Sequence, residues 1–326
     1  MMRFNLPLWA MHIPDGFLSP GATLCAAFLA ILGVGLALRR LNMSVGDRLV
    51  PLVGVTAAAI FAGQMVNFPL IGLPASGHLM GGVLAAVLLG PWGGVLALTA
   101  VLMVQCLVFG DGGLTALGAN VVNMALIGSG CGYVLFDQLR RLLAGPRGTV
   151  IAAAVASWFA VTLSAIAFSI EMAGGGEFEF SSLAALMLMV HAVVGLGEAM
   201  ITGLAIAWLV RVRPELIYGG SFTQSTPTTR GYVTAAGLTI ALAIAIFAAP
   251  LASELEDGLE SVAVQMQFAD RAVANDLAPL TDYQLCGVSE WLMTSALATS
   301  LVGVLGTTLT WGVAWGMARS VSTSRS

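Results

Sequence analysis

Long apolar segments separated by short polar turns are the feature that most constrains the fold of this chain. Nine stretches are apolar enough to be candidate membrane spans, and most approach the length that an α-helix needs to cross a bilayer. Only 9% of the residues are charged, against about 25% in soluble domains. The sequence therefore predicts an all-α integral membrane protein. The predicted spans are residues 20–39, 50–70, 74–90, 92–109, 115–138, 149–171, 183–210, 231–251 and 290–318.

The third and fourth predicted spans are separated by a turn signal, Gly90-Pro91-Trp92-Gly93-Gly94. One continuous helix through this point would carry a proline and three glycines at its centre. Proline breaks the helical hydrogen-bond ladder and glycine weakens a helix. We therefore expect two spans that meet at a turn in these residues.

Arginine supplies every basic side chain of this protein and is clustered in alternate loops. Because positively charged loops remain cytoplasmic, the amino terminus is predicted outside the cell and the carboxy terminus inside. The expected location is a bacterial or archaeal cell membrane, crossed several times. The clusters are Arg39, Arg40 and Arg48; Arg140, Arg141 and Arg147; Arg211, Arg213 and Arg230; and Arg319 with Arg325.

A polar stretch at residues 212–230 is predicted to be a cytoplasmic linker between two domains. Before it, residues 11–211 would form a seven-span unit. After it, residues 231–326 would form a two-span hairpin around a polar external segment at 252–289. Residues 1–10 are read as a leader, or as the result of a mis-assigned start codon.

Several classes of function lack support in the sequence. The chain contains no Walker loop, GxGxxG or HExxH motif, so ATPase, dinucleotide-dependent and zinc-protease chemistry are not indicated. Its net charge of −4 gives no sign of a nucleic-acid partner. We therefore expect no catalytic residues and no enzymatic activity.

Two of the three histidines lie in stretches that share the predicted external side. If Met11 carried a free amine, that amine, the His12 amide and the His12 ring Nδ1 would place three nitrogens in one plane. His78 could fill the fourth corner, and square-planar nitrogen sets suit Ni(II) and Cu(II). The predicted metal ligands are therefore Met11, His12 and His78, although His12 could instead be an ordinary loop histidine near the membrane surface.

Polar side chains inside the predicted spans form a second group of candidates. Such groups are costly in a membrane and usually face the interior of the bundle. They are expected either to surround the metal site or to join helices through hydrogen bonds. The candidates are Gln64, Asn67, Asn120, Asn123, His191 and Glu198.

Three stretches resemble the CbiM/NikM family, the cobalt and nickel substrate-capture components of energy-coupling factor (ECF) transporters. They are Met-His-Ile-Pro-Asp-Gly-Phe-Leu-Ser-Pro at 11–20, residues 76–94 with Ser-Gly-His-Leu-Met-Gly-Gly, and residues 191–202. The resemblance implies a seven-helix bundle and the same three metal ligands. The segment at 254–260 resembles the PDGLE signature of an accessory subunit, with Glu256 in place of the signature proline.

The resemblance also implies a function. The protein would capture Ni²⁺ or Co²⁺ outside and release it inside, with a link to cobalamin biosynthesis. The ion would be transported cargo, and no cofactor would be bound permanently. A separate transmembrane scaffold (T) subunit and two ATPase (A) subunits would drive transport. The alternatives are a gradient-driven secondary transporter with His191 and Glu198 as a proton relay, and a non-transporting membrane scaffold or sensor.

Overall fold

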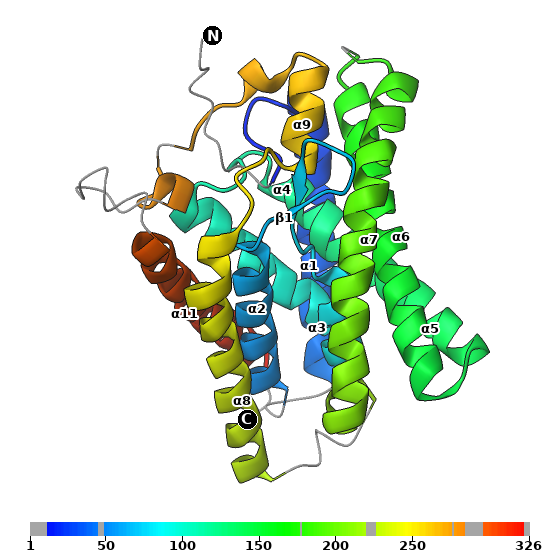
Figure 1. The fold of residues 1–326 in the computed structure, drawn as a ribbon, viewed down its shortest axis with the longest axis vertical. Coiled ribbons are helices and arrows are strands. Elements are labelled where there is room, and N and C mark those ends of the chain that lie inside the picture. The colour runs from blue at the N-terminus through cyan, green and yellow to red at the C-terminus, as the bar shows by residue number, and fades with distance from the viewer. Residues whose placement is uncertain are drawn as a thin grey trace.

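The computed structural model describes residues 12–44, 49–176, 178–219, 226–275, 277–283 and 296–322. These residues are almost entirely helical, and most of the helices run side by side as a bundle (Figure 1). The main helices are α1 (Pro20–Ser44), α2 (Val50–Gln64), α3 (Gly82–Val104), α5 (Gly132–Leu142), α6 (Gly145–Ala173), α7 (Phe180–Val212), α8 (Pro227–Ala243) and α11 (Ala296–Ser322). The predicted all-α class is confirmed.

Seven helical segments in the described part of the chain are long and apolar enough to cross a membrane by length and composition, against nine predicted spans. The difference arises because α2, with 15 residues, is shorter than a span, and because the predicted spans 74–90 and 92–109 fall in one helical segment, Gly82–Phe109. The prediction of an integral membrane protein is confirmed. Several of the seven continue through short π-helical segments, which join α4 (Leu117–Asn120) to α5 and extend α3 and α8. The seven segments are Pro20–Leu41, Gly82–Phe109, Leu117–Leu142, Gly145–Ala173, Phe180–Val212, Pro227–Leu251 and Ala296–Val321.

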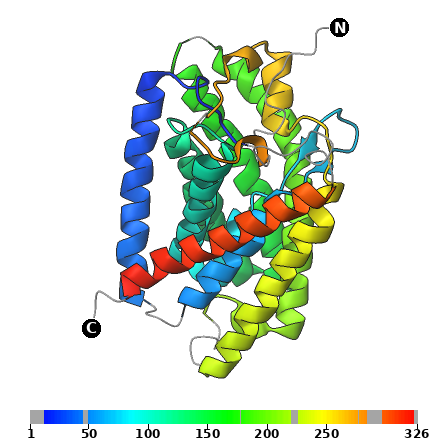
Figure 2. The same ribbon diagram turned by 90° about the vertical axis from the view of Figure 1, so that its left-hand side faces the viewer.

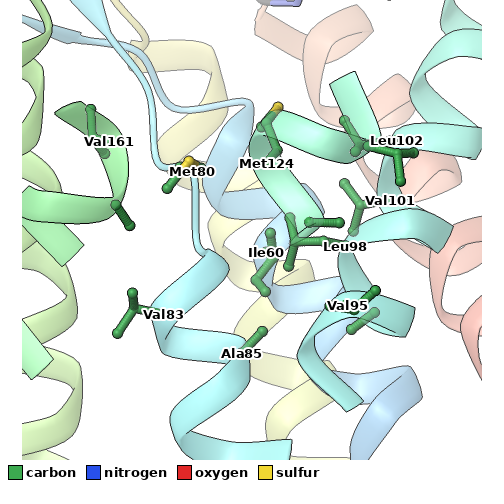
Figure 3. Packing of buried hydrophobic residues seen from close by; sticks show 14 of the residues in the cluster. Ile60, Met80, Val83, Ala85, Val95, Leu98, Val101, Leu102, Met124 and Val161 are labelled. Carbon is green, nitrogen blue, oxygen red and sulfur yellow. The ribbon is translucent and has the colours of Figure 1, made fainter. Parts of the chain in front are cut away.

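The segment that contains α3 turns back on itself at Gly90, where φ is 75° and ψ is 170°. A Cβ atom added to Gly94 would lie 3.0 Å from Cα of Ala86. In a straight helix residues eight apart are separated by about 12 Å, so the two legs lie against each other. Figure 3 shows Val83 and Ala85 on one leg and Val95 on the other, with Ala85 on the side nearer to Val95. The turn predicted at residues 90–94 is therefore present.

Two predicted spans differ from the structure between residues 65 and 81. The predicted span 50–70 is helical only to Gln64, and the predicted span 74–90 becomes helical only at Gly82. Between them the strands β1 (Phe68–Pro69) and β2 (Ser76–Gly77) pair in antiparallel register. The segment is apolar enough to suggest a span because much of it is buried within the protein.

The carboxy-terminal helices pack on the rest of the bundle. Figure 2 shows α11 crossing the face formed by α2 and α8. Small residues allow the close approach of these helices. Gly306 faces Phe61, and Gly237 faces Val55 on the same helix α2. One continuous hydrophobic cluster therefore includes residues from both parts of the chain.

The polar segment that follows α8 covers one end of the bundle. It includes the short helix α9 (Gly258–Gln265), which packs on α7. The same end holds the loop that precedes α1 and the β1–β2 hairpin (Figure 1). The described part of the segment predicted to be external, residues 252–275 and 277–283, therefore lies over the loops that carry two of the candidate histidines.

Candidate metal site

All three histidines of the chain line one cavity of about 110 Å³. His12 comes from the loop before α1, His78 from the loop after β2, and His191 from α7. The ring centroids of His12 and His78 are 5.7 Å apart. Met11, the third predicted ligand, lies outside the described residues. Among the described residues no group of three or more His, Cys, Asp or Glu is close enough to hold a metal ion.

His12 is almost completely buried, with 2% of its surface exposed. Its Nδ1 lies 2.9 Å from Oδ1 of Asp111, and its Nε2 is buried without a hydrogen-bond partner among the described residues. An unpaired imidazole nitrogen in a buried cavity is a suitable ligand for a transition metal. The predicted amine chelate would use Nδ1 instead, and in this arrangement Asp111 occupies Nδ1.

The loop that carries His12 is anchored to α4 and to the turn that precedes α4. Asn120 accepts from the backbone N–H of Ile13 at 3.0 Å and donates to its carbonyl at 3.1 Å. The carboxylate of Asp15 accepts from the backbone N–H groups of Leu114 and Thr115 at 2.9 and 2.8 Å. His12 is therefore followed by backbone that is fixed at two points.

The loop that carries His78 is extended backbone inside the protein. Backbone groups at membrane depth need partners within the protein, and interior polar side chains supply them here. The carboxylate of Glu198 accepts from the N–H groups of Met80 and Gly81 at 2.7 and 2.9 Å. Gln64 donates to the Met80 carbonyl at 3.1 Å. Both residues are completely buried, and together they fix the loop beside His78.

The other predicted polar residues differ in their relation to the cavity. Asn120, Asn123 and His191 line it. Asn123 donates to Glu171 at 2.9 Å, and Nδ1 of His191 lies 3.0 Å from the Met187 carbonyl. Asn67 does not line the cavity, and its backbone carbonyl accepts from Ser253 at 2.9 Å instead.

The segment after α8 closes the cavity and contacts the loops that form it. Asp257, at the start of α9, is one of its lining residues. The N–H of Ser76, two residues before His78, donates to the Glu256 carbonyl at 2.7 Å. The hydroxyl of Tyr283 donates to Oδ2 of Asp111 at 2.8 Å. The C-terminal part of the chain therefore completes the site.

Burial and nearby charges set the pKa values around the cavity. Burial raises the pKa of Asp257 to about 6 and that of Glu260 to about 7, where the charges of Asp257 and Glu256 add to the effect. Burial acts in the same direction on Asp111, but the charge of His12 and the hydrogen bonds from His12 and Tyr283 hold its pKa below the ordinary value. Asp111 is therefore an acceptor at neutral pH.

Three of these residues were not predicted from the sequence. Asp111 lies in the glycine-rich turn Gly110-Asp111-Gly112-Gly113, where one acidic residue between two apolar segments was the available signal. Asp257 lies in the polar segment predicted to be external, and only 5% of it is exposed. Nothing in the sequence around Tyr283 connects it to a histidine more than 270 residues away.

The family CbiM, described as a cobalt uptake substrate-specific transmembrane region, matches residues 12–216. This chain belongs to that family. The PDGLE domain matches residues 232–323, so the chain joins a CbiM region to a PDGLE domain. Both resemblances inferred from the sequence are confirmed.

Relatives extend over the whole chain or over its CbiM part. A candidate fused nickel transport protein NikMN of Archaeoglobus fulgidus is 34% identical over 316 residues, which cover 96% of this chain and 100% of the relative. The cobalt transport protein CbiM of Sorangium cellulosum is 33% identical and covers 64% of this chain and 94% of its own length. The chain therefore belongs to a family of nickel and cobalt transport proteins, as a transporter component and not an enzyme.

The fold of this chain is similar to that of a solved transporter structure. The crystal structure of a truncated transition metal transporter is 30% identical and superposes with a TM-score of 0.56. It covers 61% of this chain and 98% of its own length. The likeness thus concerns less than two thirds of this chain.

Proposed function

We propose that this chain is the substrate-binding component of an ECF-type importer. It captures Ni²⁺ or Co²⁺ on the external side of the cell membrane and delivers the ion to the cytoplasm. A separate scaffold subunit and two ATPase subunits supply the movement and the energy. The metal ligands are His12 and His78, joined by Met11 when its amine is free. The ion is cargo, and the protein retains no permanent cofactor.

The observation that carries this proposal is the convergence of the three histidines on one cavity. Each comes from a different element, and the loops of His12 and His78 are both held by buried polar side chains. Such support for ligand residues is typical of metal sites. The two imidazoles suit both Ni²⁺ and Co²⁺, and the type of ligand alone does not show which of these metals is transported.

The gradient-driven alternative has less support. It assigns Glu198 and His191 to a proton relay, but Glu198 already accepts two backbone hydrogen bonds in the loop after His78. The Nδ1 of His191 faces the Met187 carbonyl within its own helix. These contacts favour supporting roles for both residues.

Metal binding by the purified full chain tests the capture step. Calorimetric titration with Ni²⁺ and with Co²⁺ should give one ion per protein, and His12→Ala and His78→Ala should each weaken binding at least 10-fold. Cys131→Ser is the matched control, because it removes an exposed metal-binding group away from the cavity. Absence of stoichiometric metal in the unsubstituted protein would leave the scaffold or sensor alternative.

Metal uptake by cells tests the energy source and the partners. Cells that produce the chain with its scaffold and ATPase subunits should accumulate Ni²⁺ or Co²⁺. Cells that lack the ATPase subunits should not, because the chain has no ATP-binding motif of its own. Full uptake without those subunits would favour the gradient-driven alternative.

Thiol labelling from each side of the membrane tests the proposed orientation of the chain. The arginine clusters support an external amino terminus and an internal carboxy terminus. In a chain freed of its native cysteines, Glu179→Cys before α7 should react with an impermeant thiol reagent from outside. Arg147→Cys at the start of α6 should react only from inside. The reverse labelling pattern would contradict the proposed orientation.

A further inference from the structure

We propose that Asp257, contributed by the PDGLE domain, supplies a negative charge that stabilises a divalent cation in the cavity lined by the three histidines. It acts on the bound ion through space and needs no bond to the metal. The inference rests on the proposed function to the extent that the cavity binds Ni²⁺ or Co²⁺. It is independent of which ring nitrogen of His12 is the ligand.

The cavity offers a divalent ion neutral ligands and little charge. Imidazole binds metals in its neutral form, and most of the other lining residues are apolar. If the His12 amide is deprotonated in the chelate with the Met11 amine, it cancels one of the two charges of the ion. A charge left uncompensated in a buried site is costly. The bound ion is therefore stabilised by a further negative charge nearby.

Asp257 is the carboxylate that is placed to provide this charge. Among the described residues that line the cavity, it alone is acidic. It is 5% exposed, and His12 and Asp111 are near enough to act on it electrostatically. Asp111 does not itself line the cavity, and its two oxygens are occupied by His12 and Tyr283. The C-terminal domain thus brings the acidic group that the cavity wall otherwise lacks.

The backbone around Asp257 is fixed between two elements that carry histidines. Oδ1 of Asp257 accepts from a backbone N–H in the first turn of α9 at 2.7 Å. A Cβ atom added to Gly258 would lie 3.4 Å from Cε1 of His191, so the start of α9 lies directly against α7. On the other side, the Ser76 hydroxyl donates to the Leu255 carbonyl at 2.7 Å, next to the loop of His78. The carboxylate is therefore held beside the cavity before an ion arrives.

A charged Asp257 costs stability in the metal-free protein. Burial raises its pKa to about 6, because the folded protein disfavours the carboxylate form. Among the described residues no basic side chain forms an ion pair with it. A buried charge without a partner is destabilising, and such groups are typical of functional sites. A cation in the cavity supplies the missing partner.

Asp257→Asn separates charge from structure, because asparagine is an equally good N-cap of nearly the same size. Calorimetric titration of the purified full chain with Ni²⁺ at about pH 8, where the carboxylate is charged, should show about 10-fold weaker binding, as for the loss of a group outside the ligand set. Thermal unfolding of the metal-free samples should show a variant at least as stable as the unsubstituted protein. Weaker binding with a matching loss of stability would instead indicate a structural role and contradict the inference.

Asp257→Ser is a second variant that keeps an N-cap and removes the charge, and it should lose the same affinity. Glu254→Gln is the matched control in the same segment. Its carboxylate is exposed, so water and salt screen it, and its loss should leave the affinity within about threefold. If Asp257→Asn and Asp257→Ser bind Ni²⁺ as tightly as the unsubstituted chain, the inference is wrong.

His12→Ala and the unsubstituted chain separate this inference from the proposed function. Ni²⁺ binding that is lost in His12→Ala but unchanged in Asp257→Asn would support metal capture and contradict the role of Asp257. Absence of both Ni²⁺ and Co²⁺ binding by the unsubstituted chain would contradict metal capture, and the inference would fall with it.

Discussion

Asn120 and Ile13 are joined by two reciprocal hydrogen bonds, one in each direction between the side-chain amide and the backbone of Ile13. Ile13 is 5% exposed and directly follows His12. The pair therefore ties the backbone beside the candidate ligand to α4, which is otherwise remote in the sequence. Each buried backbone group that loses its partner costs about 1–3 kcal/mol.

Asn120→Ala should accordingly weaken Ni²⁺ binding by about 10-fold or more, because the loop of His12 loses both bonds. Calorimetric titration of the purified protein measures the change. Asn67→Ala is the control, since Asn67 does not line the cavity and should leave the affinity within about threefold. Equal affinities for Asn120→Ala and the unsubstituted protein would contradict the anchoring role.

Glu198→Gln should disturb the loop of His78. A carboxylate accepts from the two backbone N–H groups with its two oxygens, whereas glutamine keeps one accepting oxygen and replaces the other with an NH₂ group that cannot accept. Hydrogen bonds to buried charged groups contribute about 1.5–3 kcal/mol each, so we expect at least a 10-fold weaker Ni²⁺ affinity and a lower unfolding temperature. Glu215→Gln, in the ion pair with Arg213 beyond α7, is the matched control and should change neither. Retention of full affinity by Glu198→Gln would show that the loop does not depend on this carboxylate.

The PDGLE domain should add a pH dependence to stability through Asp257. Its folded-state pKa of about 6 lies above the ordinary value, so its favourable contribution is present below about pH 4 and is lost as the pH rises through 6. Asp257→Asn keeps an N-cap for α9 without a charge. The variant should be more stable than the unsubstituted protein at pH 8, by up to roughly 3 kcal/mol, and similar to it near pH 4.

Thermal unfolding in detergent between about pH 4 and pH 8 measures this difference across the expected range. Asp270→Asn is the control, because Asp270 is exposed and should show no such pH-dependent gain. A constant difference in stability between Asp257→Asn and the unsubstituted protein at every pH would contradict the assignment.

The sequence predicted the helices and turns that depend on properties of neighbouring residues. Apolar length located the helices, and the cluster at residues 90–94 located the reversal, because glycine and proline act on the backbone where they stand. The same reasoning extended helices into residues 65–81, since burial in protein and burial in lipid select similar side chains. Only the hydrogen bonds with Gln64 and Glu198 distinguish the loop at residues 65–81 from a membrane-spanning helix.

The candidate site was predictable only in part for a related reason. The histidines could be chosen by their chemistry, and the six interior polar residues by their cost in a membrane. Asp111 and Tyr283 acquire their roles from contacts that span 99 and 172 residues of sequence. A single sequence contains no record of such pairings, so these two residues required the fold.

The residues before His12 should determine how the metal is held, and two forms of the protein can be compared. A form that begins at Met11 offers an amine, the His12 amide and Nδ1, provided that Nδ1 leaves Asp111. A form that keeps residues 1–10 replaces the amine with a peptide nitrogen, which is much harder to deprotonate. The longer form must then rely on Nε2 of His12 together with His78. We expect it to bind Ni²⁺ at least 10–100-fold more weakly.

Asp111→Asn separates the two binding modes, because Asp111 supports Nε2 ligation and competes with Nδ1 ligation. It should weaken Ni²⁺ binding by the longer form and should not weaken binding by the form that begins at Met11. Visible absorption supplies a second readout, since four nitrogens in a plane give the square-planar Ni(II) spectrum only in the shorter form. Equal affinities and identical spectra for the two forms would mean that the Met11 amine is not a ligand, and the site would then depend on the imidazoles of His12 and His78.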